Sequence, residues 1–156
     1  MRVVDASVWV GRLVDTEAHY AASRRWIEVY LARGGQMVAP MLLLAEVAGA
    51  VARRIGDKAL ANRATEALLA VPNLRLVPLD AQLGQASAQL AADLGLKGAD
   101  ATYVAVAHLL GVPLVTWDRQ QGERAAERIA VYTPDADRML DLGMLHETAD
   151  SVYRTT

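Results

Sequence analysis

The chain has no cysteine and no phenylalanine among its 156 residues. Without cysteine there is no disulfide framework and no cysteine-ligated zinc or iron–sulfur site. Without phenylalanine the core has to be built chiefly from Leu, Val, Ala and Met. Hydrophobic residues make up 53% of the sequence and charged residues 22%, so the chain can bury a full core as one ordinary domain.

The sequence also has no excess of positive charge. The 16 Lys and Arg residues oppose 18 Asp and Glu residues, which gives a formal net charge of −2. No overall basic field therefore draws the protein onto nucleic acid, and a polyanion has to be held by a local patch or by metal ions. The N-terminal apolar run, MRVVDASVWVGR, is too short and too interrupted for a signal peptide or a membrane span. We expect a cytoplasmic protein with no membrane partner.

Short apolar segments alternate with helical ones along the chain. The pattern predicts strands at residues 2–7, 37–39, 74–78, 112–118 and 129–134. It predicts helices at 8–13, 17–33, 41–56, 57–71, 80–94, 100–110 and 119–127. Ser7 is expected to cap the first of these helices, and Pro40 to lie in the first turn of the third. The alternation indicates an α/β fold with a parallel sheet between helices.

Four acidic residues occur where such a fold would bring them to one edge of the sheet. Asp5 ends the first strand, and Asp118 follows the fourth. Asp100 begins the helix that leads into the fourth strand, and Glu46 lies within two turns of the start of the helix after the second. Ligands of parallel sheets bind at the carboxyl ends of the strands. We therefore expect this acidic quartet to share one site.

Glu46 is the most informative member of the quartet. Its helical neighbours three and four positions away are leucine, glycine and alanine, so its carboxylate faces apolar surroundings. An unpaired buried carboxylate costs several kcal/mol, which a bound cation or a salt bridge to Arg53 or Arg54 would offset. The small glycine and alanine leave room for a ligand to approach.

A cluster of carboxylates without cysteine, and with few histidines in the chain, is typical of Mg²⁺ or Mn²⁺ sites. Such an ion would polarise a phosphodiester and lower the pKa of an attacking water, which indicates hydrolysis of a phosphate ester. A structural explanation stands beside this one, because Asp100 and Asp118 taken singly fit helix caps. Their convergence with Asp5 and Glu46 is harder to explain by structure alone.

The acidic quartet also resembles a known family. Asp5 in VVDASVWV, Glu46 in LLLAEV, Asp100 in KGADATYVAVA and Asp118 in LVTWDRQQ are similar to the motifs of PIN-domain ribonucleases, most closely the VapC toxins of prokaryotic toxin–antitoxin pairs. The resemblance covers nearly the whole chain. It implies a three-layer α/β/α fold with a central, mainly parallel five-stranded sheet. Residues 1–134 would form the nuclease core, and 135–156 a helix and tail of the same domain.

The resemblance also implies an activity. The protein would be a Mg²⁺- or Mn²⁺-dependent endoribonuclease that hydrolyses RNA with a metal-activated water, usually as a homodimer inhibited by a cognate VapB-like antitoxin. Asp5 and Asp100 would bind the metal directly, and Glu46 and Asp118 directly or through water. Two alternatives stay open. One is a catalytically idle PIN scaffold that binds a partner protein or RNA, and the other is a PIN nuclease in RNA processing.

Several other residues are candidates for supporting roles. Ser7 and Thr116 match positions where the family often has a hydroxyl that hydrogen-bonds the metal ligands, although a helix cap and a β-branched strand residue are the favoured explanations. Trp117 can stack on a base or pack between helices, and packing is favoured. The candidates for RNA contact are Arg12, Lys97 and Arg119, and Arg53 and Arg54 could also hold phosphates. Solvated surface charge is the plain alternative for each of them.

Overall fold

The computed structural model describes residues 1–137. Its strands form one sheet in the order β3-β2-β1-β4-β5, and every neighbouring pair is parallel. The strands are β1 (Arg2–Val4), β2 (Met37–Pro40), β3 (Leu74–Val77), β4 (Leu114–Val115) and β5 (Val131–Tyr132). The predicted α/β fold with a central, parallel five-stranded sheet is therefore confirmed.

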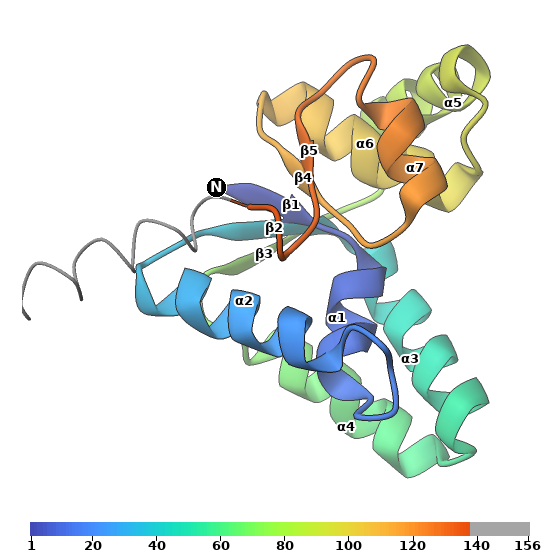
Figure 1. The fold of residues 1–156 in the computed structure, drawn as a ribbon. Helices are drawn as coiled ribbons and strands as arrows, with labels where there is room; N and C mark the ends of the chain where they lie inside the picture. The colour runs from blue at the N-terminus through green and yellow to red at the C-terminus, as the bar shows by residue number, and fades with distance from the viewer. Residues whose placement is uncertain (138–156) are drawn as a thin grey trace, which may run out of the picture.

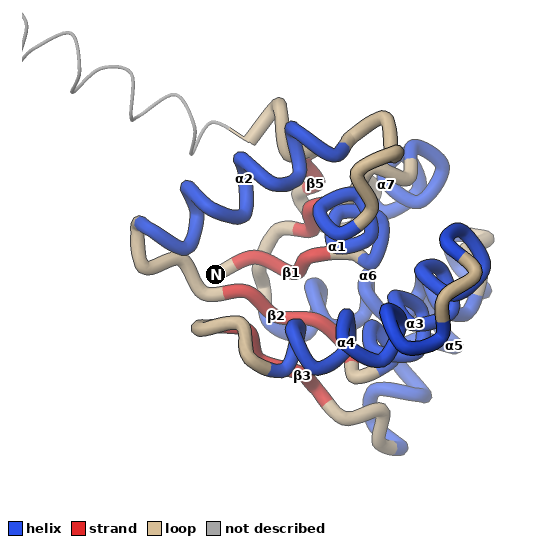
Figure 2. Tube along the Cα trace, turned by 90° about the horizontal axis from the view of Figure 1, so that it is seen from below, coloured by secondary structure: helices blue, strands red, loops and turns tan. Residues whose placement is uncertain are grey.

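Helices cover both faces of this sheet, as Figure 1 shows. One layer contains α1 (Ala6–Leu13), α2 (Tyr20–Ala32), α3 (Leu42–Ile55) and α4 (Lys58–Leu69). The other contains α5 (Ala81–Leu94), α6 (Gly98–Leu110) and α7 (Arg119–Ala125). Seen from the side of the first layer, α2 lies near β5 and α4 near β3 (Figure 2). The predicted three-layer arrangement is thus present.

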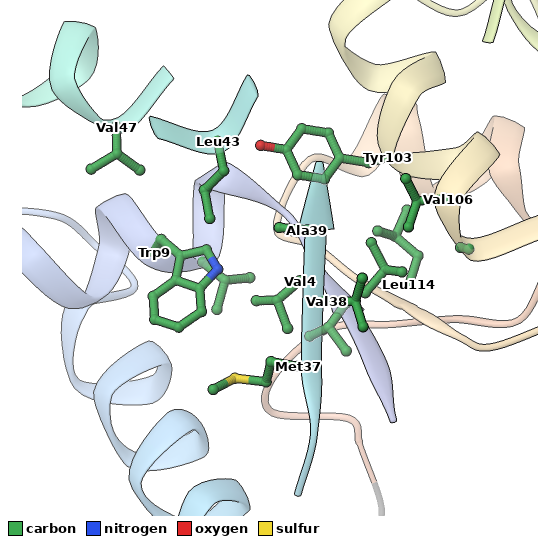
Figure 3. Close-up of a cluster of buried hydrophobic side chains, with 14 of the residues drawn as sticks. Val4, Trp9, Met37, Val38, Ala39, Leu43, Val47, Tyr103, Val106 and Leu114 are labelled. Carbon is green, nitrogen blue, oxygen red and sulfur yellow. The ribbon is translucent and has the colours of Figure 1, made fainter. Parts of the chain in front are cut away.

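The core fills the space on both sides of the central strands. β1 and β2 are buried almost throughout, which explains their continuous apolar sequences. Figure 3 shows Trp9 on one side of β2, and Tyr103 and Leu114 on the other. All three side chains are at most 1% exposed. Burial of large side chains of this kind stabilises a fold by roughly 1.5–3 kcal/mol each.

Two of the predicted element boundaries are wrong for identifiable reasons. Ser7 does not cap the first helix, because Asp5 does so and its carboxylate accepts a hydrogen bond from the Ser7 N–H at 2.9 Å. Aspartate is as good an N-cap as serine, so the helix begins earlier than predicted. Pro40 ends β2 instead of starting a helix. It pairs with Val77 of β3 alone, since the pairing of β1 with β2 stops at Val38, and so it occupies an edge position that proline tolerates.

Other boundaries differ by a few residues. The segment before α2 forms a turn, so this helix begins at Tyr20 and not at residue 17. α6 begins at Gly98, two residues before the predicted start, and β4 and β5 are shorter than predicted. Most of the predicted C-terminal helix and tail, 135–156, lies outside the described residues. None of the helices within 1–137 is long and apolar enough to cross a membrane.

Candidate active site

The fold brings the elements that carry the acidic quartet to the carboxyl edge of the sheet. Asp5 is the N-cap residue of α1, directly after β1, and Asp118 is the N-cap residue of α7, shortly after β4. Asp100 lies in the first turn of α6, and Glu46 lies in α3, which follows β2. Figure 1 shows β1 passing into α1 and β2 into α3 at this same edge.

Asp5 is the most enclosed of the four acids. Its side chain is 6% exposed, and one carboxylate oxygen, Oδ2, accepts hydrogen bonds from the Ser7 N–H at 2.9 Å and the Thr116 hydroxyl at 3.1 Å. The other oxygen, Oδ1, accepts a bond from Gln121 Nε2 at 3.4 Å. Burial raises the pKa of Asp5 above its ordinary value, although these hydrogen bonds lower it in part.

Glu46 reaches the site from α3 and contacts α6. Its carboxylate accepts a hydrogen bond from the Tyr103 hydroxyl at 2.6 Å, and Figure 3 shows that hydroxyl directed toward the start of α3. Burial raises the pKa of Glu46, the Tyr103 bond lowers it, and the charges of Asp5 and Asp100 raise it further. Glu46 is therefore held close to two other members of the quartet.

The alternative salt bridge from Glu46 to Arg53 or Arg54 is wrong within the part of the chain that the structure describes. Arg54 forms its ion pair with Glu17, at 3.0 Å. Indeed, no member of the quartet has a Lys or Arg ion pair among residues 1–137. The four acids are thus not explained as halves of separate salt bridges.

Asp100 makes no hydrogen bond that caps α6, so the alternative that it serves only as a helix cap does not hold. Lys97 is the N-cap residue of α6 and makes no side-chain cap bond. Burial raises the pKa of Asp100, and the charges of Asp118 and Asp5 raise it further, whereas Lys97 and Arg124 lower it. Asp100 is half-buried and close enough to two acids for their charges to act on it.

Asp118, in contrast, does act as a cap. Its Oδ1 accepts a hydrogen bond from the Gln121 N–H at 2.9 Å, so the capping role predicted as an alternative is present. A capping bond uses only part of the acceptor capacity of a carboxylate. The same side chain can therefore cap α7 and take part in the site.

Two hydroxyls connect Asp5 with the segment around Asp118. Thr116 donates its hydroxyl to Asp5 and accepts from the Asp118 N–H at 2.9 Å. The Ser7 hydroxyl lies 3.4 Å from that of Thr116 and accepts from the Trp117 N–H at 3.0 Å. Ser7 and Thr116 thus support the acids through hydrogen bonds, as the sequence suggested, while their role in a working site stays a prediction.

Gln121 is a site residue that the sequence analysis missed. Its side chain is 1% exposed, and its Nε2 lies 3.4 Å both from Asp5 Oδ1 and from the backbone carbonyl of Asp100. Its Oε1 has no hydrogen-bond partner within the described chain. Gln121 comes three residues after Asp118, as Tyr103 comes three after Asp100, so each shares a helix face with an acid. That spacing was the available signal for both residues.

The candidate RNA-contact residues lie at the surface or partly at it. Arg119 is exposed and pairs with Glu123 at 3.6 Å, an exposed contact of small energy. Lys97 is exposed at the start of α6, and Arg12 lies in the last turn of α1. Within residues 1–137 no hydrogen bond or ion pair joins these three to the acids, although the charge of Lys97 acts on Asp100, and their role in binding RNA stays a prediction.

The chemistry of the donor set fits a hard divalent cation. The acids offer only carboxylate oxygens, the ligands that Mg²⁺ and Mn²⁺ prefer. Over residues 1–137, no group of three or more His, Cys, Asp or Glu side chains is arranged so that it could hold a metal ion by itself. Magnesium sites in nucleotide-processing enzymes commonly use one or two carboxylates, with waters and substrate phosphates completing the shell. A bound cation would also offset the desolvation and the charge repulsion that raise the pKa values of three of the acids.

The raised pKa values predict how stability depends on pH without metal. The folded protein keeps protons on Asp5, Glu46 and Asp100 at a pH where the unfolded chain has lost them. The stabilising contribution of these protons is complete below the unfolded pKa, about 4, and is lost as pH rises through the higher folded values. In EDTA, the melting temperature of Asp5→Asn should therefore fall less steeply than that of the wild type above that pH. Parallel curves would contradict this prediction.

Comparison with known proteins shows which family the sequence matches. The model of the PIN domain matches residues 2–127. A search of curated proteins finds no match. Among solved structures, the fold is similar to the sarcin–ricin loop cleaving toxin VapC20 of Mycobacterium tuberculosis, with a TM-score of 0.65 and 20% identity over 83% of this chain and 97% of that one.

Two further structures have the same fold. PAE2754 from Pyrobaculum aerophilum gives a TM-score of 0.65 and 19% identity, covering 92% of this chain and 95% of that chain. A toxin–antitoxin complex from Klebsiella pneumoniae gives a TM-score of 0.62 and 18% identity, covering 86% of this chain and 98% of its matched chain. At these identities the similarity establishes a shared fold across nearly the full length of each neighbour.

Proposed function

The chain belongs to the PIN-domain family, and on that premise we propose that it is a metal-dependent endoribonuclease, the toxin of a type II toxin–antitoxin pair. One observation carries the proposal. Four carboxylates from separate parts of the chain lie at one edge of the sheet without ion pairs to Lys or Arg among residues 1–137, and the pKa values of Asp5, Glu46 and Asp100 are raised. Such crowding is tolerable when a divalent cation is bound.

The residues of the chain would share the work as follows. Asp5 and Asp100 would bind Mg²⁺ or Mn²⁺ directly, and Glu46 and Asp118 directly or through water. Once bound, the ion supplies an activated water and positive charge beside the phosphodiester. Thr116 and Gln121 would hold Asp5 in place through the hydrogen bonds described above. Tyr103 would do the same for Glu46.

RNA as the substrate and an antitoxin as the partner are supported by the neighbours. The Mycobacterium tuberculosis protein cleaves the sarcin–ricin loop, and the Klebsiella pneumoniae structure is a toxin–antitoxin complex. We also propose a cytoplasmic homodimer that a VapB-like antitoxin inhibits, as the resemblance of the sequence to the VapC toxins implies. We expect the O3′ atom to be the leaving group, so that hydrolysis leaves a 5′-phosphate and a 3′-hydroxyl.

Cleavage of an RNA panel tests the proposed function. The purified chain, free of any antitoxin, would be incubated with structured RNAs in Mg²⁺, in Mn²⁺ and in EDTA, and the product ends would be identified. We expect cleavage in either metal and none in EDTA, because the acids need a cation to act on a phosphodiester. Equal cleavage in EDTA would refute the metal-dependent mechanism. Absence of cleavage in both metals would favour the idle scaffold instead.

A further inference from the structure

A cavity of about 280 Å³ lies beside the acidic quartet, between α1, α3 and the turn that precedes α2. Ser7 and Glu46 line it, so it adjoins the candidate active site directly. Ala50 also lines it, at the position where the sequence suggested that small residues leave room for a ligand. Besides small and apolar residues, the lining contains Glu17, the rings of His19 and Trp117, and Arg53 and Arg54. The catalytic roles proposed above use neither these rings nor these arginines.

The aromatic part of the cavity is Trp117 together with His19. Their rings stack with centroids 3.9 Å apart and an interplanar angle of 7°. Trp117 is fixed further by its indole N–H, which donates to the hydroxyl of the buried Ser23 at 2.8 Å. Trp117 therefore packs between neighbouring elements, as the sequence predicts. This packing holds a flat aromatic pair at the wall of a cavity next to Asp118, already positioned for stacking.

The cationic part of the cavity is Arg53. Its guanidinium lies against the backbone of α3, where a Cβ at Gly49 would come within 2.9 Å of Nη1. Arg53 is exposed, and its guanidinium has no hydrogen bond or ion pair to any other residue in the range 1–137. Arg54, by contrast, is bound to Glu17 at 3.0 Å. Arg53 thus offers a guanidinium fork that is not engaged by a carboxylate, and such a fork binds phosphate oxygens well.

We propose that this cavity is a nucleotide subsite, which binds one nucleotide of the RNA strand next to the phosphodiester that is cleaved. Its base stacks against the His19–Trp117 pair, and Arg53 binds its phosphate. This inference rests on the proposed function, since it places the subsite beside the acidic quartet. The volume of the cavity suits a single nucleotide, and Arg54 already pairs with Glu17 in its wall, which leaves Arg53 to meet a phosphate.

Binding of a fluorescein-labelled, mixed-sequence RNA decamer in EDTA tests the subsite. His19→Ala and Arg53→Ala remove one exposed side chain each, and Arg63→Ala removes an exposed arginine from α4, away from the cavity. We expect each of the first two variants to bind the decamer roughly tenfold more weakly than the wild type, because base stacking and a phosphate contact are lost. Arg63→Ala should bind as the wild type does, and melting curves should show that all three variants are folded at the temperature of the binding assay.

A second readout is independent of affinity and of cleavage. The decamer with 4-thiouridine, irradiated in complex with the full chain, should form an adduct on a peptide that contains His19 or Trp117. Cleavage should show a raised KM with little change in kcat for His19→Ala and Arg53→Ala. If the wild type cleaves RNA but both variants behave like Arg63→Ala and the adducts lie elsewhere, the subsite is wrong and the nuclease stands. If the wild type neither binds nor cleaves RNA, both proposals are wrong, and a protein ligand becomes the better occupant.

Discussion

Asp5→Asn and Asp100→Asn should each lower RNA cleavage by at least about a thousandfold, because on the proposed mechanism each removes a direct metal ligand and forfeits several kcal/mol of stabilisation of the transition state. The fold should survive both changes. Asparagine still accepts the capping bond that Asp5 takes from the Ser7 N–H. It also removes a buried carboxylate whose pKa burial has raised, so Asp5→Asn should be at least as stable as the wild type in EDTA.

The matched control is Asp80→Asn. Asp80 caps α5 through a hydrogen bond from the Leu83 N–H at 2.9 Å, in the same way as Asp5 caps α1, but it does not belong to the acidic quartet. Initial cleavage rates and melting temperatures of the three variants are the measurements. We expect Asp80→Asn to cleave at the wild-type rate. Cleavage that persists in Asp5→Asn or Asp100→Asn at the rate of Asp80→Asn would refute the assignment of metal ligands.

Gln121→Leu should lower cleavage, or the affinity for Mn²⁺, by roughly 10- to 100-fold, the usual cost of removing a residue that orients a metal ligand. The amide of Gln121 links Asp5 to the backbone of Asp100, and leucine leaves that link broken. The loss of stability should not exceed about 1–3 kcal/mol, the cost of leaving Asp5 Oδ1 and the Asp100 carbonyl without this donor, because leucine fits a buried position and removes the Oε1 atom that has no partner within the described chain. The effect therefore separates positioning from folding.

The neighbouring residue gives the control for this prediction. Gln120 is exposed, and Gln120→Leu makes the same chemical change one residue earlier in α7 without touching an acid. It should cleave as the wild type does. Mn²⁺ titrations in the two variants would show whether Gln121 acts on metal affinity. Equal activity of Gln121→Leu and Gln120→Leu would contradict a positioning role for Gln121.

The fold was largely predictable because its signals are local. Apolar segments that alternate with helical ones specify a parallel sheet between helices, and Asp57 and Asp80 mark their helix starts as expected. The boundary at Asp5 was missed because aspartate and serine compete as N-caps two residues apart. Pro40 was misplaced because its tolerance in β2 depends on where the pairing with β1 stops, which is a tertiary fact.

The candidate site likewise has one part that the sequence predicts and another that depends on tertiary contacts. The acids could be proposed from the sequence because their positions relative to strands and helix starts are visible there, and parallel sheets bring such positions together. Gln121 and Tyr103 were missed because their contacts cross between helices, to Asp5 and to Glu46, over more than 50 residues of sequence. The ion pair of Arg54 with Glu17, and the freedom of Arg53 from any partner within residues 1–137, likewise depend on how the turn before α2 packs against α3.

Calorimetric titration of Mn²⁺ into the metal-free protein tests most directly whether the acidic quartet exists to hold a divalent ion. The wild type and Asp80→Asn should bind Mn²⁺ with the same affinity, and Asp5→Asn and Asp100→Asn should show no saturable binding. Mn²⁺ binding that is as tight in Asp5→Asn and Asp100→Asn as in the wild type, or absent from the wild type itself, would contradict the account.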